Sequence, residues 1–217
     1  MRIAIPITAS SMKKALKDIK EASKSADFIE LRIDYLKRPD LKRLLSSSSV
    51  PMIVTNRAQD EGGHFKGTEE KRLSSLKKAI DLGAAYIDIE LSHYIKLEKK
   101  RTKIIVSYHN FYETPINLKE IYQKILAKKA DIVKIACKAN NKKDVKRVIK
   151  LLESSRKDMI GICMGEIGKI TRLHPKNYLT FACLNTAEGS APGQFTIDEM
   201  LLFRKSQMAN YHKSARK

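Results

Sequence analysis

The sequence of 217 residues has few cysteines and few aromatic side chains. It contains three cysteines and no tryptophan, and only 6% of its residues are aromatic. Cys137, Cys163 and Cys183 lie in apolar runs and form no CxxC pair, which favours buried free thiols in a reducing compartment over disulfides or zinc. No histidine pair has the spacing of metal ligands and no glycine-rich phosphate loop occurs, so we expect neither a metal nor another cofactor.

Long hydrophobic runs are also missing. No apolar stretch approaches the roughly 18 residues that a membrane-spanning helix requires. The first residues, MRIAIPIT, turn polar too soon for a secretory signal peptide. We therefore expect a cytoplasmic protein without a membrane partner. With 42% hydrophobic residues the chain can form a sizeable core, so we do not expect intrinsic disorder.

Positive charge predominates in the composition. The 43 lysine and arginine residues outnumber the 24 acidic residues, which gives a formal net charge of +19. Such a charge attracts anions and can bind nucleic acid without sequence specificity. The basic residues nevertheless alternate with apolar residues at helical spacing, as on solvated helix faces. The basic stretches are 96–103, 124–129, 138–150 and a tail at about 209–217.

The chain repeats a unit of one strand followed by one helix. Apolar and β-branched runs predict eight strands, at Ile3–Thr8, Phe28–Asp34, Met52–Arg57, Tyr86–Leu91, Lys103–His109, Ile132–Cys137, Met159–Met164 and Leu179–Leu184. Helical patterns are found at Ser10–Ser25, Pro39–Ser47, Thr68–Leu82, Ser92–Lys99, Asn117–Lys129, Lys142–Ser154 and Thr196–Met208. The link after the seventh strand is short and weakly helical.

The alternation predicts parallel strands, because each helix returns the chain to the same edge of the sheet. At about 27 residues per unit, the chain meets the lower size limit of a (β/α)8 barrel. A doubly wound open sheet is the competing fold, but the first strand is followed by TASS rather than by a glycine-rich nucleotide-binding turn. We predict an α/β protein with a single (β/α)8 TIM-barrel domain over residues 1–217.

Polar side chains gather at the ends of the predicted strands, where barrels of this class carry their active sites. The second strand places Glu30, Arg32 and Asp34 on one face, and the fourth places Asp88 and Glu90 on one face. Further candidates lie at three other strands: Arg57 ends the third, Arg172 is in the loop after the seventh, and the segment 189–194 follows the eighth. These groups either bind a small polyhydroxylated carboxylate or form a salt-bridge network at the rim.

Lys134 lies inside the predicted strand DIVKIAC, where an ammonium group is costly to bury. Desolvation and cations such as Arg57 or Arg172 would favour the uncharged amine, which can attack a ketone to form a Schiff base. The structural alternative is an ion pair with Glu30 or Glu90.

His109 is the only histidine that ends a predicted strand. It is either a hydrogen-bonded structural residue or, beside an amine that forms an iminium, a proton shuttle.

The segment 189–194 contains Gly189 and Gly193 and is either a closing lid or an ordinary turn.

In this order, the motifs resemble those of the type I 3-dehydroquinase family, and the resemblance covers nearly the whole chain. They are ELRID at 30–34, RAQDEGG at 57–63, SYHNF at 107–111, VKIA at 133–136, MG at 164–165, TR at 171–172, LTFA at 179–182 and SAPGQ at 190–194. The resemblance implies a cofactor-free (β/α)8 enzyme that dehydrates 3-dehydroquinate to 3-dehydroshikimate in the shikimate pathway of aromatic amino-acid biosynthesis. Family members are often homodimers, and some are fused to shikimate dehydrogenase.

The resemblance also implies a role for each matching residue. Lys134 would form the Schiff base with the C3 carbonyl. His109 would take the C2 proton and help the C1 hydroxyl leave, and Glu61 would hold the His109 ring. The substrate-binding positions would be Glu30, Arg32 and Arg57 for the ring hydroxyls, and Arg172, Ser190 and Gln194 for the carboxylate.

Two other hypotheses stay open. A class I aldolase-like lyase on the same barrel would use Lys134 on a sugar phosphate, although no clear glycine nest for phosphate follows the seventh or eighth strand. A basic nucleic-acid-binding protein is the non-enzymatic alternative, but its class usually combines basic residues with more aromatics than this chain has.

Overall fold

The computed structural model describes residues 1–185 and 189–214, with side chains up to residue 207. The side chains of the predicted basic tail, residues 209–217, therefore lie outside the described part of the chain. The strands form one curled, parallel sheet in the order β7-β6-β5-β4-β3-β2-β1-β8-β9. Their bounds are β1 (Ile3–Ile7), β2 (Phe28–Arg32), β3 (Met52–Thr55), β4 (Tyr86–Glu90), β5 (Lys103–Asn110), β6 (Ile132–Lys138), β7 (Met159–Met164), β8 (Thr180–Cys183) and β9 (Phe195–Thr196).

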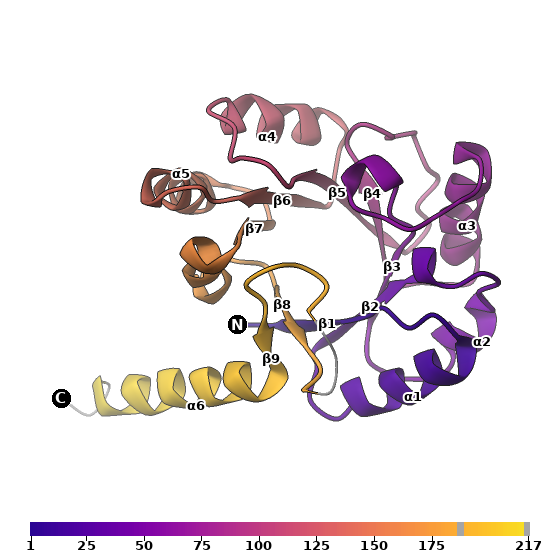
Figure 1. Cartoon of the computed structure of the whole chain (residues 1–217), viewed down its shortest axis with the longest axis horizontal. Coiled ribbons are helices and arrows are strands. Elements are labelled where there is room, and N and C mark those ends of the chain that lie inside the picture. The colour runs from indigo at the N-terminus through magenta and orange to yellow at the C-terminus, as the bar shows by residue number, and fades with distance from the viewer. Residues whose placement is uncertain (186–188, 215–217) are drawn as a thin grey trace.

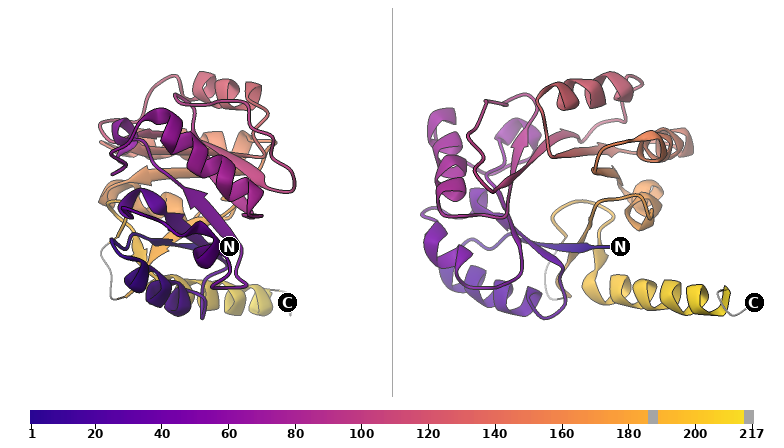
Figure 2. Two further views of the ribbon diagram at one scale, coloured as in Figure 1. Left: turned by 90° about the vertical axis from the view of Figure 1, so that its right-hand side faces the viewer. Right: turned by 180° about the vertical axis from the view of Figure 1, so that it is seen from behind.

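Helices surround the curled sheet, and α6 extends beyond the rest of the molecule (Figures 1 and 2). The α-helices are α1 (Met12–Ala22), α2 (Leu41–Leu45), α3 (Glu69–Asp81), α4 (Leu118–Ala127), α5 (Lys142–Ser154) and α6 (Ile197–Ser214). The 3-10 helices are η1 (Ile33–Tyr35), η2 (Gln59–Glu61) and η3 (Glu166–Leu173). Parallel strands that alternate with outer helices confirm the predicted barrel-like α/β fold. None of the described helices has both the length and the apolar character needed to cross a membrane.

Local sequence explains where several helices begin and which face they bury. The buried residues of α1 are Ala15, Ile19 and Ala22, a spacing that places them on one side of the helix. At the start of α5, the Asn141 side chain accepts from the backbone of Asp144, whose carboxylate accepts from the backbone of Asn141 in return.

Apolar residues fill both sides of the sheet. Outward-facing strand residues such as Ile29 and Leu31 belong to one buried cluster with helix residues such as Ile19. A second cluster lies in the barrel interior, where it includes Phe28 and Tyr178 and reaches the floor of the carboxyl-end pocket at Phe181. The charged groups of the barrel interior lie toward the carboxyl ends of the strands, where (β/α)8 barrels carry their active sites.

The strand order ends at β7 on one side and at the β8-β9 pair on the other, and the barrel closes through a seam between these ends. The backbone N–H of Tyr178 donates to the carbonyl of Met159 over 2.7 Å. The Asn177 side chain accepts from the Gly161 N–H over 2.8 Å. Farther along, β9 pairs with β8. These bonds replace a regular strand ladder at the seam.

The helix predicted over Ser92–Lys99 is wrong, because this segment forms a turn followed by irregular chain. The Tyr94 hydroxyl donates to the carbonyl of Lys128 over 2.8 Å, and Leu97 is buried. A short segment has little helical stability of its own, so tertiary contacts determine its path.

The second strand is also shorter than predicted. It ends at Arg32, and the chain turns into η1, so Asp34 does not continue the strand. Most other boundaries differ from the predicted ones by a few residues, and α6 continues to Ser214.

Candidate active site

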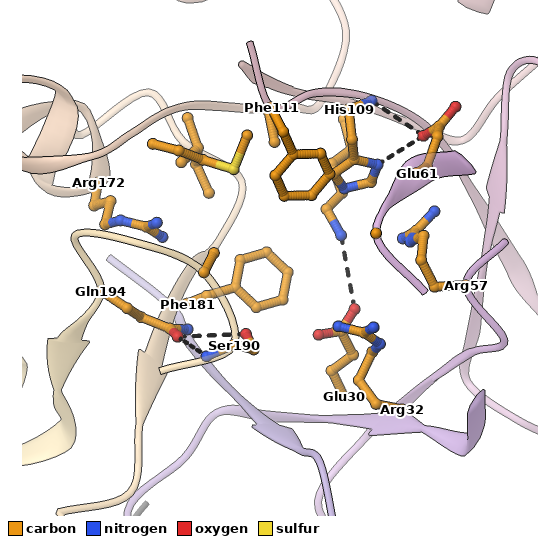
Figure 3. A pocket seen from close by; sticks show the side chains of 16 residues that line it. Glu30, Arg32, Arg57, Glu61, His109, Phe111, Arg172, Phe181, Ser190 and Gln194 are labelled. Carbon is orange, nitrogen blue, oxygen red and sulfur yellow. Dashed lines mark hydrogen bonds and ion pairs between the residues drawn. The ribbon is translucent and has the colours of Figure 1, made fainter. Parts of the chain in front are cut away.

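A pocket opens inside the barrel at the carboxyl ends of the strands, with an empty volume of about 620 Å³ that includes its open mouth (Figure 3). All nine residues that the resemblance singled out line it. The complete lining is Glu30, Arg32, Arg57, Glu61, Gly62, His109, Phe111, Lys134, Ala136, Ile162, Met164, Arg172, Phe181, Ser190, Ala191 and Gln194.

Lys134 projects from β6 into the pocket, and only 7% of its side chain is exposed. Its Nζ lies 2.8 Å from Asp88 Oδ2 and 3.6 Å from Glu30 Oε1. The Phe181 ring lies 4.7 Å from the same nitrogen. The structural alternative named an ion pair with Glu30 or Glu90. The pair with Glu30 is present, and Asp88, which that alternative did not name, is the closer partner.

Asp88 on β4 joins Lys134 to Arg57. Its Oδ1 accepts from Arg57 Nη2 over 2.7 Å and from Ser107 Oγ over 2.6 Å. Burial alone would raise the pKa of Asp88, but Arg57 and Lys134 hold it well below its usual range. Arg57 also pairs with Glu90 over 2.9 Å, and despite burial the two carboxylates raise its pKa. The two carboxylates therefore neutralise Arg57, and a carboxylate stands between it and Lys134.

Arg72 on α3 completes this buried network from the outer side and is only 1% exposed. Its Nη1 donates to Glu90 Oε2 over 2.8 Å and to the Asn56 carbonyl over 2.5 Å. Its other nitrogens bind Glu69 over 2.7 and 2.8 Å. Glu90 in turn accepts from the Ala58 N–H over 2.9 Å. The loop after β3 is thus fixed from two sides.

His109 near the end of β5 faces the same pocket. Its Nδ1 lies 2.8 Å from Glu61 Oε2, and its backbone N–H donates to the same oxygen over 3.1 Å. Burial, Arg57 and Lys134 lower the pKa of His109 well below its ordinary value. The ring is therefore uncharged at neutral pH. Because a carboxylate faces Nδ1, the hydrogen belongs on Nδ1, and Nε2 keeps a lone pair.

Glu61 comes from η2, the 3-10 turn between β3 and α3. Its second oxygen, Oε1, accepts from the Ser92 hydroxyl over 3.0 Å. Burial raises the pKa of Glu61 to about 7, although Arg57 and Ser92 act in the opposite direction. Glu61 is consequently the member of the pair that is poised to change protonation near neutral pH.

Arg172 on η3 is buried at 1% exposure but has no carboxylate beside it among the described residues. Its Nη2 donates to the Pro192 carbonyl over 3.2 Å, and its Nε has no hydrogen-bond partner among the described residues. Burial lowers the pKa of Arg172 to about 10. An uncompensated guanidinium that lines a pocket is suited to bind an anion.

The segment 189–194 lies beside Arg172 at the pocket edge (Figure 3). Gln194 Oε1 accepts from the backbone N–H and the hydroxyl of Ser190, over 2.7 and 3.3 Å. Its Nε2 has no partner in the described chain. Gly193 has φ +72°, and a Cβ there would lie 2.7 Å from the carbonyl oxygen of Gly165. The segment therefore approaches the end of β7 as closely as only glycine allows.

Two further predicted residues already have partners within the protein. Arg32 forms a bidentate salt bridge with Asp34, in which Nε donates to Oδ1 over 2.9 Å and Nη2 donates to Oδ2 over 2.8 Å. Glu30 accepts from the Thr55 hydroxyl over 3.0 Å. Both side chains still line the pocket and present polar edges to it.

Several contributors to the site were not identified from the sequence. The period-two alternation places Asp88 on the correct face of its strand but does not identify it as the partner of Lys134. Ser92 was assigned to a helix, which concealed its contact with Glu61. Phe111 and Phe181 form apolar walls of the pocket. Candidate site residues stand out in the sequence as polar side chains at strand ends, and these two are apolar. Among the described residues, no group of His, Cys, Asp or Glu side chains is arranged to hold a metal ion.

Comparisons with known proteins agree on one family. The model of the family described as type I 3-dehydroquinase matches residues 3–207. A 3-dehydroquinate dehydratase of Methanocaldococcus jannaschii is 39% identical over 91% of this chain and 95% of its own length. The bifunctional 3-dehydroquinate dehydratase/shikimate dehydrogenase of Arabidopsis thaliana is 38% identical over 92% of this chain and 36% of its own length.

A solved structure agrees with these relatives. The type I 3-dehydroquinate dehydratase of Clostridium difficile, described with covalent modified comenic acid, superposes with a TM-score of 0.84 at 26% identity, over 98% of this chain and 92% of its own.

Proposed function

The chain belongs to the type I 3-dehydroquinase family and is a 3-dehydroquinate dehydratase, and from this premise we propose that it works through a Schiff base on Lys134. The observation that carries the proposal is the placement of the Lys134 amine. It lies buried in the pocket, on the strand next to the one that carries the uncharged His109. An amine and a base on the same side of adjacent strands can act on neighbouring carbons of one substrate.

The reaction begins when the Lys134 ammonium releases a proton to solvent and the resulting amine adds to the C3 carbonyl of 3-dehydroquinate, whose oxygen takes up a proton. Loss of water from the adduct gives an iminium, which draws electrons from the neighbouring C2–H bond. His109 Nε2 takes the C2 proton, and the electron pair moves to nitrogen to give an enamine. The enamine then expels the C1 hydroxyl, to which His109 returns the proton so that it leaves as water. Hydrolysis of the remaining iminium frees 3-dehydroshikimate and Lys134.

Glu61 supports both steps performed by His109. It accepts from Nδ1, which fixes the ring so that Nε2 faces the pocket, and its negative charge stabilises the imidazolium formed after proton abstraction. Asp88 and Glu30 hold the Lys134 side chain within the pocket in the resting enzyme.

We assign the substrate carboxylate to Arg172, supported by its buried and uncompensated guanidinium. Ser190 and Gln194 lie at the same end of the pocket and supply further hydrogen bonds. Glu30, Arg32 and Arg57 lie around the pocket on β2 and after β3 and are assigned to the ring hydroxyls. No observation favours a sugar phosphate or a nucleic acid as the ligand.

Replacement of Lys134 tests the proposal. Lys134→Ala should abolish turnover of 3-dehydroquinate, because no other group in the pocket can form the iminium. Lys138→Ala is the matched control, since Lys138 lies on the same strand but is exposed. Far-UV circular dichroism should show that both variants remain folded. Residual activity above a few per cent in folded Lys134→Ala would show that Lys134 is not the nucleophile.

We further propose that the protein is a cytoplasmic homodimer. Three buried free cysteines support a reducing compartment, since Cys137 and Cys163 occupy paired positions on β6 and β7 as thiols. Exposed apolar side chains at Ile167, Ile170 and Leu202 offer surface for self-association, which light scattering would detect. A shikimate dehydrogenase is the enzyme that would consume the product, and the Arabidopsis relative joins both activities in one chain.

A further inference from the structure

The irregular segment that follows β4 contacts the turn that carries Glu61. Ser92 and His93 are consecutive residues of this segment, and each binds a different carboxylate of η2. The Ser92 hydroxyl donates to Glu61 Oε1 over 3.0 Å. The His93 Nε2 lies 3.0 and 2.9 Å from the two oxygens of Asp60.

From these contacts we propose that Ser92 is a positioning residue, which holds the Glu61 carboxylate in the orientation that His109 requires. A carboxylate has two oxygens, and in this structure they are divided between two tasks. Oε2 receives both hydrogen bonds from His109, and Oε1 receives the one from Ser92. Without Ser92, rotation of the carboxylate would meet less resistance, and the bond to the His109 ring would be less well aligned.

The segment that presents Ser92 is itself anchored on both sides. The Leu91 N–H donates to the Ser107 carbonyl over 2.7 Å, which ties the start of the segment to β5. His93 also lies 3.3 Å from Glu69, at the start of α3. Ser92 is therefore held between two fixed neighbours, although its own side chain reaches solvent. Two anchors make its hydroxyl a stable donor despite that exposure.

The same hydroxyl favours the ionised form of Glu61, because a donor stabilises a carboxylate more than a carboxylic acid. The other charged groups that influence Glu61 are Arg57, which favours ionisation, and Asp88 and Glu90, which oppose it. His109 contacts Glu61 directly through Nδ1. Loss of the Ser92 donor should therefore raise the pH at which Glu61 takes up a proton and ceases to support His109.

The proposal rests on the proposed function and is tested by the pH dependence of kcat/KM for 3-dehydroquinate. Ser92→Ala should move the acidic limb of the profile upward by about half a pH unit to one unit, because one hydrogen bond to a charged group is lost. The rate should fall roughly three- to tenfold on that limb and little on the alkaline side. Ser92→Thr, which keeps a hydroxyl, should restore the wild-type profile.

Ser74→Ala is the matched control, because this exposed α3 serine donates only to the Lys71 carbonyl within its own helix. Its profile should coincide with that of the wild type. An unshifted acidic limb in Ser92→Ala would overturn the proposal, as would a uniform loss at every pH that Thr does not repair. Failure of the proposed function would look different, since the wild-type protein itself would then form no covalent adduct with 3-dehydroquinate.

Discussion

At the scale of single residues, Arg172 and Lys134 differ in how their charge is balanced. Lys134 lies beside two carboxylates, whereas Arg172 has no carboxylate partner among the described residues. Burial without compensation lowers the pKa of Arg172 to about 10, so the folded protein bears a cost for keeping this group charged at pH 7. A cost of this kind is expected where a ligand supplies the missing anion.

Arg172→Gln should therefore have opposite effects on binding and on stability. Loss of a charge-assisted pair with the substrate carboxylate should raise KM by roughly 10- to 100-fold. Removal of the uncompensated charge should raise the Tm of the free enzyme, because the substitution eliminates a cation whose pKa folding lowers. Steady-state kinetics and calorimetry measure the two effects. An unchanged KM would contradict the assignment of Arg172 to the carboxylate.

The residues of the site were largely predictable from the sequence, but their pairing was not. Charged side chains stood out because they occur in strands that are otherwise apolar, and period-two alternation placed Asp88 and Glu90 on one face of β4. Which of them meets Lys134 depends on the relative placement of β4 and β6, which no local pattern encodes. Arg57 and Arg72 both bind Glu90, whereas Asp88 is shared between Arg57 and Lys134.

At the scale of elements, α3 contributes to the active site although none of its residues lines the pocket. Through Arg72 it contacts Glu90 on β4 and the carbonyl of Asn56 after β3. The helix thus fixes the loop from which Arg57 projects. Strand positions were predictable because buried parallel strands are continuous apolar runs. The segment 92–99 was not, because its path depends on contacts with distant residues such as Lys128.

Arg72→Met should lower the free energy of unfolding by about 3–5 kcal/mol, because it leaves the buried Glu90 without one of its two cations. Urea denaturation measures the change. Glu69→Gln serves as the comparison, since it alters the outer, partly exposed pair of the same arginine and should cost less than about 1 kcal/mol. An equal fall in the free energy of unfolding in the two variants would show that the buried pair with Glu90 contributes no more stability than the exposed pair with Glu69.

At the scale of the whole molecule, a net charge of +19 surrounds a pocket that receives an anion. A field of this sign raises the rate at which an anionic substrate meets the protein, and salt screens it as the Debye length falls below about 8 Å. We expect kcat/KM to fall by about two- to fivefold between low and high ionic strength, with kcat nearly constant. Stopped-flow or steady-state assays at constant pH measure this. A kcat/KM independent of salt concentration would show that the net positive charge does not steer the anionic substrate to the pocket.

The two ends of the barrel interior differ in character. Its amino-terminal interior is apolar, and its carboxyl end holds the charged network in which Lys134 lies. This buried amine is the group that we propose forms a covalent bond with the substrate.

Borohydride trapping would capture this bond. The protein is mixed with 3-dehydroquinate, reduced with sodium borohydride and examined by intact mass and peptide mapping. We predict one reduced adduct on Lys134, which should also form in His109→Ala and be absent from Lys134→Ala. No adduct in the folded wild-type protein, or an adduct on another lysine, would contradict the account.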